Sequence, residues 1–286
     1  AENKLVYLSY SKPSADGQQG ATAVSRARFE NDRFTNVQEI FVAKNWSAGR
    51  GHYGSRLAFD RDGFLFITLG DRQVPPTGDL EHHPAQDLTT HHGKTIRLKD
   101  DGSVPADNPF VNTAGALPEI WSYGHRNMQG MAVDPRTGTL WQSEHGPRGG
   151  DELNLPQAGR NYGWPVITHG INYSGLKIPE AEGKTKAGME QPHHFWEKSP
   201  GLSGMAFYTG HPASAWNNSL LLGALADRNL IRLSLEGDRI VAEERLLGDL
   251  GKRIRDVRIG GDGKVYVLTD EDDGQLLELV PPAATP

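Results

Sequence analysis

Two polar clusters, joined by a strand-like run, hold the side chains best suited to chemistry in this sequence of 286 residues. One lies within Tyr123–Gln129 and the other within Ser143–Glu152. So many guanidinium, amide and carboxylate side chains are not expected together in a protein core. Binding and catalytic groups concentrate instead in loops on a rigid scaffold. The turn Gly146-Pro-Arg-Gly-Gly150 also exposes backbone carbonyl oxygens, which bind Ca²⁺ together with carboxylates. The residues in question are Arg126, Asn127, Gln129, Glu144, His145, Asp151 and Glu152.

A histidine and an aspartate further upstream form a second candidate site. His52 carries an imidazole, which titrates near neutral pH and can accept a hydroxyl proton. Asp71, at the end of the following predicted strand, would orient that ring and stabilise its protonated form. The alternative is a turn histidine and a turn-capping carboxylate, and spacing alone favours that alternative.

Other candidate groups have weaker patterns. Arg253 and Arg255 alternate on a predicted strand and therefore point to one face, although a solvated strand face has the same pattern. No carboxylate or helical spacing organises the histidines between positions 82 and 92, so we interpret them as solvent-exposed loop residues. The large aromatics are expected to pack between structural repeats, with sugar stacking as an alternative for Trp164. These two sets are His82, His83, His91 and His92, and Trp121, Trp141, Trp164 and Trp196.

The scaffold that must position these groups is predicted to be all-β. An apolar strand, an Asp/Gly turn and a second apolar strand recur at residues 56–68, 130–142 and 256–269, with a looser copy at 204–223. Such hairpins are typical of β-propeller blades, although hairpins of a β-sandwich are an alternative. Blades bury their faces only against neighbouring blades. We therefore predict one β-propeller domain over residues 1–286.

Composition excludes several classes of function. The 30 Lys and Arg residues against 36 Asp and Glu residues give a net charge of −6, which argues against nucleic-acid binding. There is no cysteine for a disulfide or a thiolate metal site, and no apolar run of membrane-spanning length. No signal peptide is visible, and a chain that starts at Ala1 is expected to have been processed or trimmed.

At these motifs the chain resembles the soluble quinoprotein aldose sugar dehydrogenases, the glucose/sorbosone dehydrogenase family. The resemblance covers nearly the whole chain and implies a propeller of the six-bladed type that uses pyrroloquinoline quinone (PQQ) and calcium. Besides the two polar clusters, the motifs are Gly51-His-Tyr-Gly-Ser-Arg-Leu, Leu69-Gly-Asp, Ala85-Gln-Asp-Leu, Gly93-Lys-Thr-Ile-Arg-Leu, Asp107-Asn-Pro-Phe, Asn161-Tyr-Gly-Trp-Pro and Arg253-Ile-Arg-Asp-Val.

The resemblance implies oxidation of aldose sugars at C1 to lactones, with an external electron acceptor, in a periplasmic or secreted bacterial protein that is a monomer or a homodimer. It favours His52 as the general base and Asp71 as its partner over the turn interpretation. Arg126 would stabilise negative charge on a quinone oxygen, with a structural ion pair as the alternative. Asn127 and Gln129 would hold the cofactor or its loop, and Arg253 and Arg255 would bind the carboxylates of PQQ.

Two calcium ions are implied as well. The backbone oxygens of Gly146 and Pro147 would bind the ion that touches the quinone. Glu144, Glu152 and the backbone of Tyr162 would belong to a second, structural calcium site. In the alternative interpretation, the acids of this region pair with Arg148 and Arg160.

The chain departs from the family pattern in two ways. Family members carry about one more blade, including a glutamine at the site, before the position of Lys4. We therefore expect about five blades here, and lower stability or pairing with another chain. A family lysine that pairs with the quinone carboxylates is Ala226 here, with Arg228 as a substitute. These departures leave a competing function open, a catalytically impaired propeller that binds sugar, cofactor or a partner. A lactonase-type calcium hydrolase is disfavoured, because such enzymes hold the metal with side-chain acids and amides.

Overall fold

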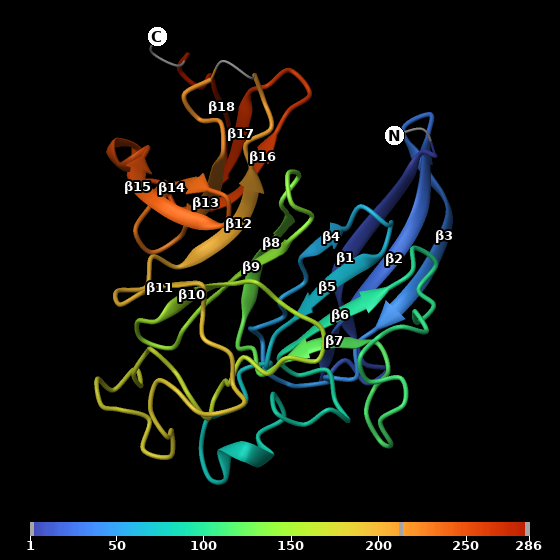
Figure 1. Cartoon of the computed structure of the whole chain (residues 1–286). Coiled ribbons are helices and arrows are strands. Elements are labelled where there is room, and N and C mark those ends of the chain that lie inside the picture. The colour runs from blue at the N-terminus through green and yellow to red at the C-terminus, as the bar shows by residue number, and fades with distance from the viewer. Residues whose placement is uncertain (1–2, 212–213, 284–286) are drawn as a thin grey trace. The chain divides into compact units, whose positions relative to one another are not determined.

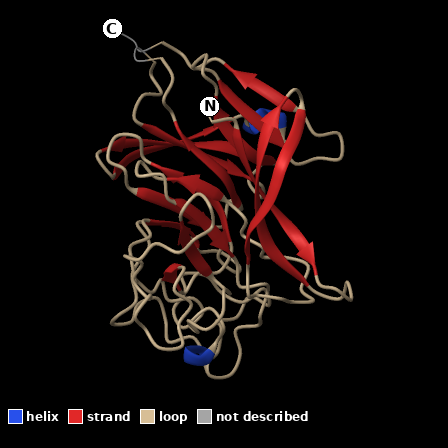
Figure 2. Ribbon diagram, turned by 90° about the vertical axis from the view of Figure 1, so that its right-hand side faces the viewer, coloured by secondary structure: helices blue, strands red, loops and turns tan. Residues whose placement is uncertain are grey.

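The computed structural model describes residues 3–211 and 214–283. Nearly all of their regular structure is β-strand, apart from two short 3₁₀ turns, η1 (Leu80–His82) and η2 (Gly248–Leu250) (Figure 2). Within the described ranges, no helix is long and apolar enough to cross a membrane. The contacts between Cα atoms divide the chain into two compact units, which are described in turn.

The first unit runs to Met128 and includes Pro156–Pro192. It contains two antiparallel sheets whose strands follow one another along the chain (Figure 1). Apolar side chains from both sheets share one core, and every residue of one inner strand, Leu65–Leu69, is buried. The strands are β1 (Leu5–Pro13), β2 (Gly20–Glu30) and β3 (Arg33–Val42) in one sheet, and β4 (Leu57–Phe59), β5 (Leu65–Leu69), β6 (Lys94–Leu98) and β7 (Ile120–Tyr123) in the other.

The second unit comprises Gln129–Leu155 and the chain from His193 onward. It contains three antiparallel sheets, again with sequential strand order (Figure 1). The strands are β8 (Met128–Val133), β9 (Leu140–Glu144), β10 (Asp151–Asn154) and β11 (His194–Trp196); β12 (Leu202–Phe207), β13 (Ser219–Ala224), β14 (Asn229–Glu236) and β15 (Arg239–Leu246); and β16 (Ile254–Ile259), β17 (Val265–Thr269) and β18 (Leu276–Leu279). Both β12 and β13 pack against β16, so apolar faces of successive sheets cover each other.

The four predicted hairpins are confirmed. They are the strand pairs β4–β5, β8–β9, β12–β13 and β16–β17, and each pair begins a four-stranded or three-stranded sheet. The described residues form five such sheets, which confirms the predicted all-β class and the expected five blades of a β-propeller. That residues 1–286 form a single domain stays a prediction.

Candidate functional site

The two residues predicted to form an acid–base pair are in direct contact in the first unit. His52 Nδ1 lies 2.6 Å from Asp71 Oδ1. The Asp71 side chain is 1% exposed, and that of His52 is 15% exposed. An ionised carboxylate can only accept hydrogen bonds, so the proton of this bond is on Nδ1. Nε2 is then left as the acceptor atom of the imidazole, which is what a general base requires.

The backbone around His52 is unusual. His52 adopts the left-handed conformation with φ 52°, and Ser55 does so with φ 79°. Non-glycine residues in this region cost free energy and cluster at functional sites. A Cβ atom on Gly70 would collide with the carbonyl oxygen of His52, so the loop approaches the end of β5 through a glycine. This close approach brings the ring to Asp71, which follows Gly70.

Asp71 is fixed by further donors besides the imidazole. The Trp164 indole Nε1 donates to Asp71 Oδ2 at 2.9 Å, and the backbone N of Gln73 donates to Oδ1 at 2.9 Å. Trp164 therefore belongs to the site, whereas the sequence favoured a packing role for it. It also packs with Leu80 and Val166, so its ring is part of a core while its indole N–H donates to the Asp71 carboxylate.

Arg126 lies beside this pair. Its backbone oxygen accepts a hydrogen bond from Asp71 N at 2.8 Å, and its guanidinium carbon lies 5.2 Å from the centre of the Trp164 ring. The Arg126 side chain also reaches the hydroxyl of Tyr173, with Nη2 3.5 Å from that oxygen. Arg126 and the adjacent Asn127 are buried. The first unit thus gathers an imidazole, a carboxylate bound to it and a guanidinium in one place.

Tyr162, the remaining predicted site residue of the first unit, is also buried. Its ring stacks on His125 with a centroid separation of 4.7 Å, and its hydroxyl accepts a hydrogen bond from Gln157 N. Its proposed role as a backbone calcium ligand stays a prediction.

In the second unit, two of the predicted calcium ligands face each other. Glu152 on β10 is the cross-strand partner of Glu144 on β9, and Asn154 Nδ2 donates to a carboxylate oxygen of each, at 2.8 Å to Glu144 and 3.1 Å to Glu152. Burial, followed by the neighbouring Glu144 charge, raises the pKa of Glu152 to about 8. Like charges opposed across strands are destabilising, so this pair is suited to a cation.

The donor set fits calcium in one further respect. Asn154 is fully buried, and its Oδ1 has no hydrogen-bond partner among the described residues. Rotation of the amide by 180° would turn this oxygen toward the two carboxylates. Carboxylate and amide oxygens are the ligands that Ca²⁺ takes. Within residues 3–211 and 214–283, however, no group of three or more His, Asp or Glu side chains is arranged as a metal site.

The turn between β9 and β10 is built around Asp151. One carboxylate oxygen of Asp151 accepts from Gly146 N at 3.0 Å, and the other accepts from Gly201 N and Leu202 N at 2.8 and 3.1 Å. Both carboxylate oxygens of Asp151 are thus used to hold the turn in place. Gly146 and Pro147 are buried, and the roles of their carbonyl oxygens as ligands stay predictions.

Arg253 and Arg255 converge, as expected for residues that point to one face. Both guanidinium groups bind Asp270, at distances from 2.9 to 3.1 Å, and the hydrogen bond from Arg255 is the main reason that the pKa of Asp270 is lowered. Two cations share one carboxylate, which leaves one positive charge for a ligand. Arg228 Nη1 donates to Gly251 O at 3.0 Å, close in sequence to this pair, whereas Ala226 is exposed. Gln129, on β8 of the same unit, is partly buried.

The interpretation of the four loop histidines as solvent-exposed is wrong for two of them. His83 and His91 are 4% and 1% exposed, and burial lowers the pKa of both imidazoles. His83 Nδ1 accepts from Ala85 N, and His91 Nδ1 accepts from Lys44 N. Backbone amides thus satisfy ring nitrogens that the sequence pattern assigned to water. His92 is half-buried, and burial lowers its pKa to about 4. His82 is exposed, as expected.

Comparison with known proteins agrees with this arrangement. The family model described as Glucose / Sorbosone dehydrogenase matches residues 1–278. The chain belongs to the glucose/sorbosone dehydrogenase family. Membership confirms the family predicted from the sequence motifs, and with it an enzyme of the sugar dehydrogenase class.

Individual relatives of this family cover nearly all of the chain. It is 49% identical to "Aldose sugar dehydrogenase YliI" of Escherichia coli (strain K12), over 98% of this chain and 74% of the relative. The solved structure of the soluble aldose sugar dehydrogenase (Asd) from Escherichia coli, in the apo form, is similar with a TM-score of 0.92 at 48% identity, covering 98% of this chain and 79% of that one. The PQQ-bound form of Aldose Sugar Dehydrogenase (Adh) from Streptomyces coelicolor gives 0.75 at 26% identity, covering 96% and 75%.

Proposed function

We propose that this chain is a PQQ- and calcium-dependent dehydrogenase that oxidises aldose sugars at C1 to lactones, with His52 as the general base. The observation that supports this proposal best is the imidazole of His52, bound at Nδ1 by a buried aspartate in a chain of this family. Oxidation at C1 breaks an O–H bond and a C–H bond. The first needs a proton acceptor in the protein, and the second needs a hydride acceptor.

The proton is assigned to His52 Nε2. A sugar hydroxyl that donates to this atom loses its proton to the ring as the C1–H bond breaks, and the ring becomes positively charged. Asp71 stabilises that charge through the 2.6 Å bond to Nδ1. Trp164 and the backbone N of Gln73 hold the carboxylate in place, so the imidazole does not have to reorient during the reaction.

The hydride acceptor is assigned to a bound cofactor. When bound, PQQ would supply a two-electron acceptor for the hydride from C1, and the carbonyl oxygens of Gly146 and Pro147 would hold a calcium ion that could polarise it. Arg253 and Arg255 suit its carboxylates, because Asp270 offsets only part of their charge. We assign Arg228 to the same function in place of the lysine that Ala226 replaces. Arg126, Asn127 and Gln129 would complete the cofactor site.

Glu144, Glu152, Asn154 and the backbone of Tyr162 are assigned to a second, structural calcium ion. We further propose that the protein works in the periplasm or outside the cell, as a monomer or homodimer, and passes electrons to an external acceptor. Neither a nucleic acid nor a membrane span enters this function.

Reconstitution tests the proposed activity. Protein treated with a chelator is mixed with PQQ and CaCl₂, and reduction of an electron-accepting dye is followed with D-glucose and other aldoses. Sugar-dependent reduction that requires both PQQ and Ca²⁺ is expected. PQQ binding without any dye reduction would instead support a cofactor-binding module and contradict the proposal.

Trp164→Phe is expected to lower kcat. The variant keeps an aromatic ring but leaves Asp71 Oδ2 without its indole donor, and loss of such a bond to a buried group costs about 1–3 kcal/mol. Asp71 is then held less firmly against the His52 ring, so kcat should fall by about 10-fold, the rate effect of roughly 1.4 kcal/mol. Trp121→Phe is the matched control, because its indole donates to Pro156 O instead. Equal kcat in both variants and the wild type would contradict this role.

Glu152→Gln is expected to change how stability depends on pH and calcium. The pKa of Glu152 is raised from 4.5 to about 8 in the folded protein, so the folded state binds more protons than the unfolded state between these values. The free energy of unfolding contributed by Glu152 is therefore present below pH 4.5 and is lost as pH rises toward 8. Calcium offsets this loss, because it binds only the folded state.

Thermal unfolding after chelator treatment measures this effect. The wild type should lose Tm between pH 5 and pH 8 and regain it with excess Ca²⁺ at pH 8. Glu152→Gln should show less of both changes, whereas Glu244→Gln, an exposed strand carboxylate, should behave like the wild type. A calcium-induced rise in Tm that is equal in Glu152→Gln and wild type would rule out Glu152 as a ligand.

A further inference from the structure

The residue after Asp71 holds the loop that carries His52. Arg72 is 1% exposed, and its guanidinium donates to the carbonyl oxygens of Gly51, Gly49 and Gly20. The bond to Gly49 measures 2.5 Å and that to Gly20 measures 3.4 Å. One planar cation thus joins the start of β2 to the carbonyl groups of Gly49 and Gly51, in the loop that leads to His52.

The same guanidinium also fixes the residue after His52. The Arg72 guanidinium carbon lies 3.4 Å from the centre of the Tyr53 ring, in a cation–π arrangement. The backbone on both sides of His52 is therefore held by one side chain. Among the residues that the structure describes, its positive charge is met by carbonyl oxygens and an aromatic face rather than by a salt bridge.

Three consecutive residues act together on this loop. Asp71 binds the His52 ring, Arg72 binds the flanking carbonyl groups and ring, and the Gln73 side chain accepts from Gly51 N at 3.0 Å. The backbone N of Arg72 also donates to the carbonyl oxygen of His52 at 3.3 Å. The position of the imidazole relative to Asp71 is thus set by the segment that supplies Asp71 itself.

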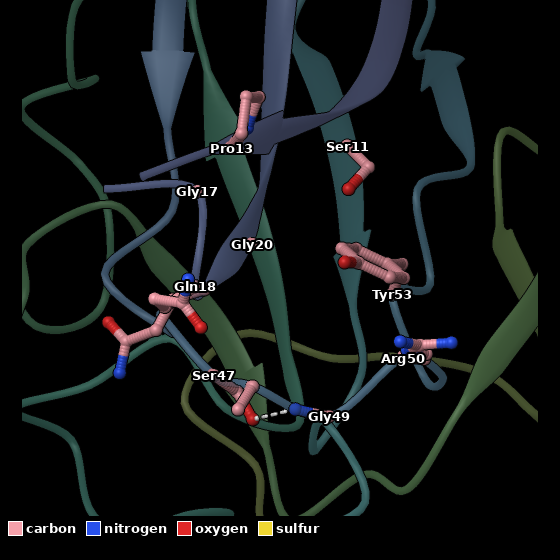
Figure 3. A pocket seen from close by; sticks show the side chains of 11 residues that line it. Ser11, Pro13, Gly17, Gln18, Gly20, Ser47, Gly49, Arg50 and Tyr53 are labelled. Atoms are coloured by element: carbon pink, nitrogen blue, oxygen red, sulfur yellow. Dashed lines mark hydrogen bonds between the residues drawn. The ribbon is translucent and has the colours of Figure 1, made fainter. Parts of the chain in front are cut away.

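A cavity borders the same loop. It has a volume of about 430 Å³ and is lined by Gly20, Ser47, Gly49, Arg50 and Tyr53 among others (Figure 3). Arg72 contacts three of these residues, namely Gly20, Gly49 and Tyr53. The loop holds His52 in the left-handed region, which persists only where surrounding contacts impose it, and Arg72 supplies several of those contacts.

We infer that Arg72 is a positioning residue, which holds the Gly49–Tyr53 loop so that the His52 imidazole meets Asp71; the inference rests on the proposed role of His52. Arginine suits this task because its planar fork can donate to several carbonyl groups while its face stacks on a ring. Lysine carries the same charge as a compact point and cannot do both. Arg72→Lys should therefore fold but release the loop.

The test combines a spectroscopic and a kinetic measurement. In ¹H NMR of the cofactor-free protein, the His52 Nδ1 proton in its short bond to Asp71 should give a far-downfield signal, assigned by its loss in Asp71→Asn. Arg72→Lys should lose or broaden this signal and lower kcat by about 10–100-fold, since small misplacements of catalytic groups cost that much. PQQ affinity and sugar KM should change little.

Arg97→Lys is the matched control. Arg97 is also buried and stacked, with its guanidinium carbon 3.8 Å from the Phe64 ring, but it binds Asp107 and Asn108. It should lose Tm and keep the downfield signal and kcat. A retained signal and kcat in Arg72→Lys, or an equal loss in both variants, would overturn the inference.

A rescue experiment separates positioning from general destabilisation. In Arg72→Ala, methylguanidinium should restore the signal and part of kcat, whereas methylammonium should not. Failure of methylguanidinium to restore either one would count against the inference. The NMR measurements need neither PQQ nor sugar, so they decide the role of Arg72 even if the proposed sugar oxidation fails.

Discussion

His52→Ala is expected to lower kcat for aldose oxidation by about 10²–10⁴-fold, the range typical of a lost general base. The His52→Ala variant should still bind PQQ, because the arginines assigned to the cofactor carboxylates are unchanged. Dye-coupled kinetics measures turnover, and a spectroscopic titration measures cofactor binding. His82→Ala is the control, since that histidine has an 85% exposed side chain and pairs with Asp79 on the surface. Near-native turnover in His52→Ala would remove His52 from the mechanism.

Asp71→Asn should be nearly as damaging, although it preserves the size of the side chain. The Asn amide can donate to Nδ1, which would place the ring proton on Nε2 and remove the base. The same substitution in the Ser-His-Asp triad of serine proteases lowers kcat by about 10⁴-fold for this reason. We expect a loss of about 10²–10⁴-fold here, with sugar KM less affected.

Asp134→Asn provides the matched comparison for Asp71→Asn. Asp134 is fully buried and binds Arg136, so its replacement tests the cost of losing a buried carboxylate elsewhere. It should reduce Tm and leave kcat nearly unchanged. Similar kcat losses in the two variants would show that Asp71 acts through stability alone.

The strand pairs were predictable because local chemistry marks their turns. In the first predicted hairpin, Asp60 Oδ1 accepts from the backbone N of Asp62 and of Phe64, and Gly63 adopts φ 82°. An Asp–Gly turn between two apolar runs therefore identifies a hairpin from the sequence. β3 was not predicted, because seven of its ten residues are exposed and its apolar residues do not alternate regularly with polar ones.

The site was predictable in its residue types but not in its supporting contacts. His52 and Asp71 stand in recognisable motifs, and their contact follows from the structure. Trp164 and Arg72 carry no comparable pattern, since a tryptophan suits any core and an arginine suits any surface. Only tertiary contacts direct the Trp164 indole to Asp71 and bury the Arg72 guanidinium among backbone carbonyl groups. The buried His83 and His91 were missed for the same reason.

For the predicted second calcium site, the structure shows which side chains face each other. In the sequence, only the resemblance to the family's second calcium site grouped Glu144 with Glu152. The register of β9 and β10 makes them cross-strand partners, and it adds Asn154 as a third oxygen-bearing side chain. Asp151, in contrast, is occupied by three backbone amides and serves the turn.

The most direct test of the proposed function follows the reacting carbon. The protein is incubated with [1-¹³C]glucose, PQQ, Ca²⁺ and an electron acceptor, and ¹³C NMR records the labelled carbon. The proposal predicts that the C1 resonance moves from the hemiacetal region to that of the lactone and its hydrolysis product, in the wild type but far more slowly in His52→Ala. An unchanged C1 resonance in the wild type, or equal conversion by His52→Ala, would contradict it.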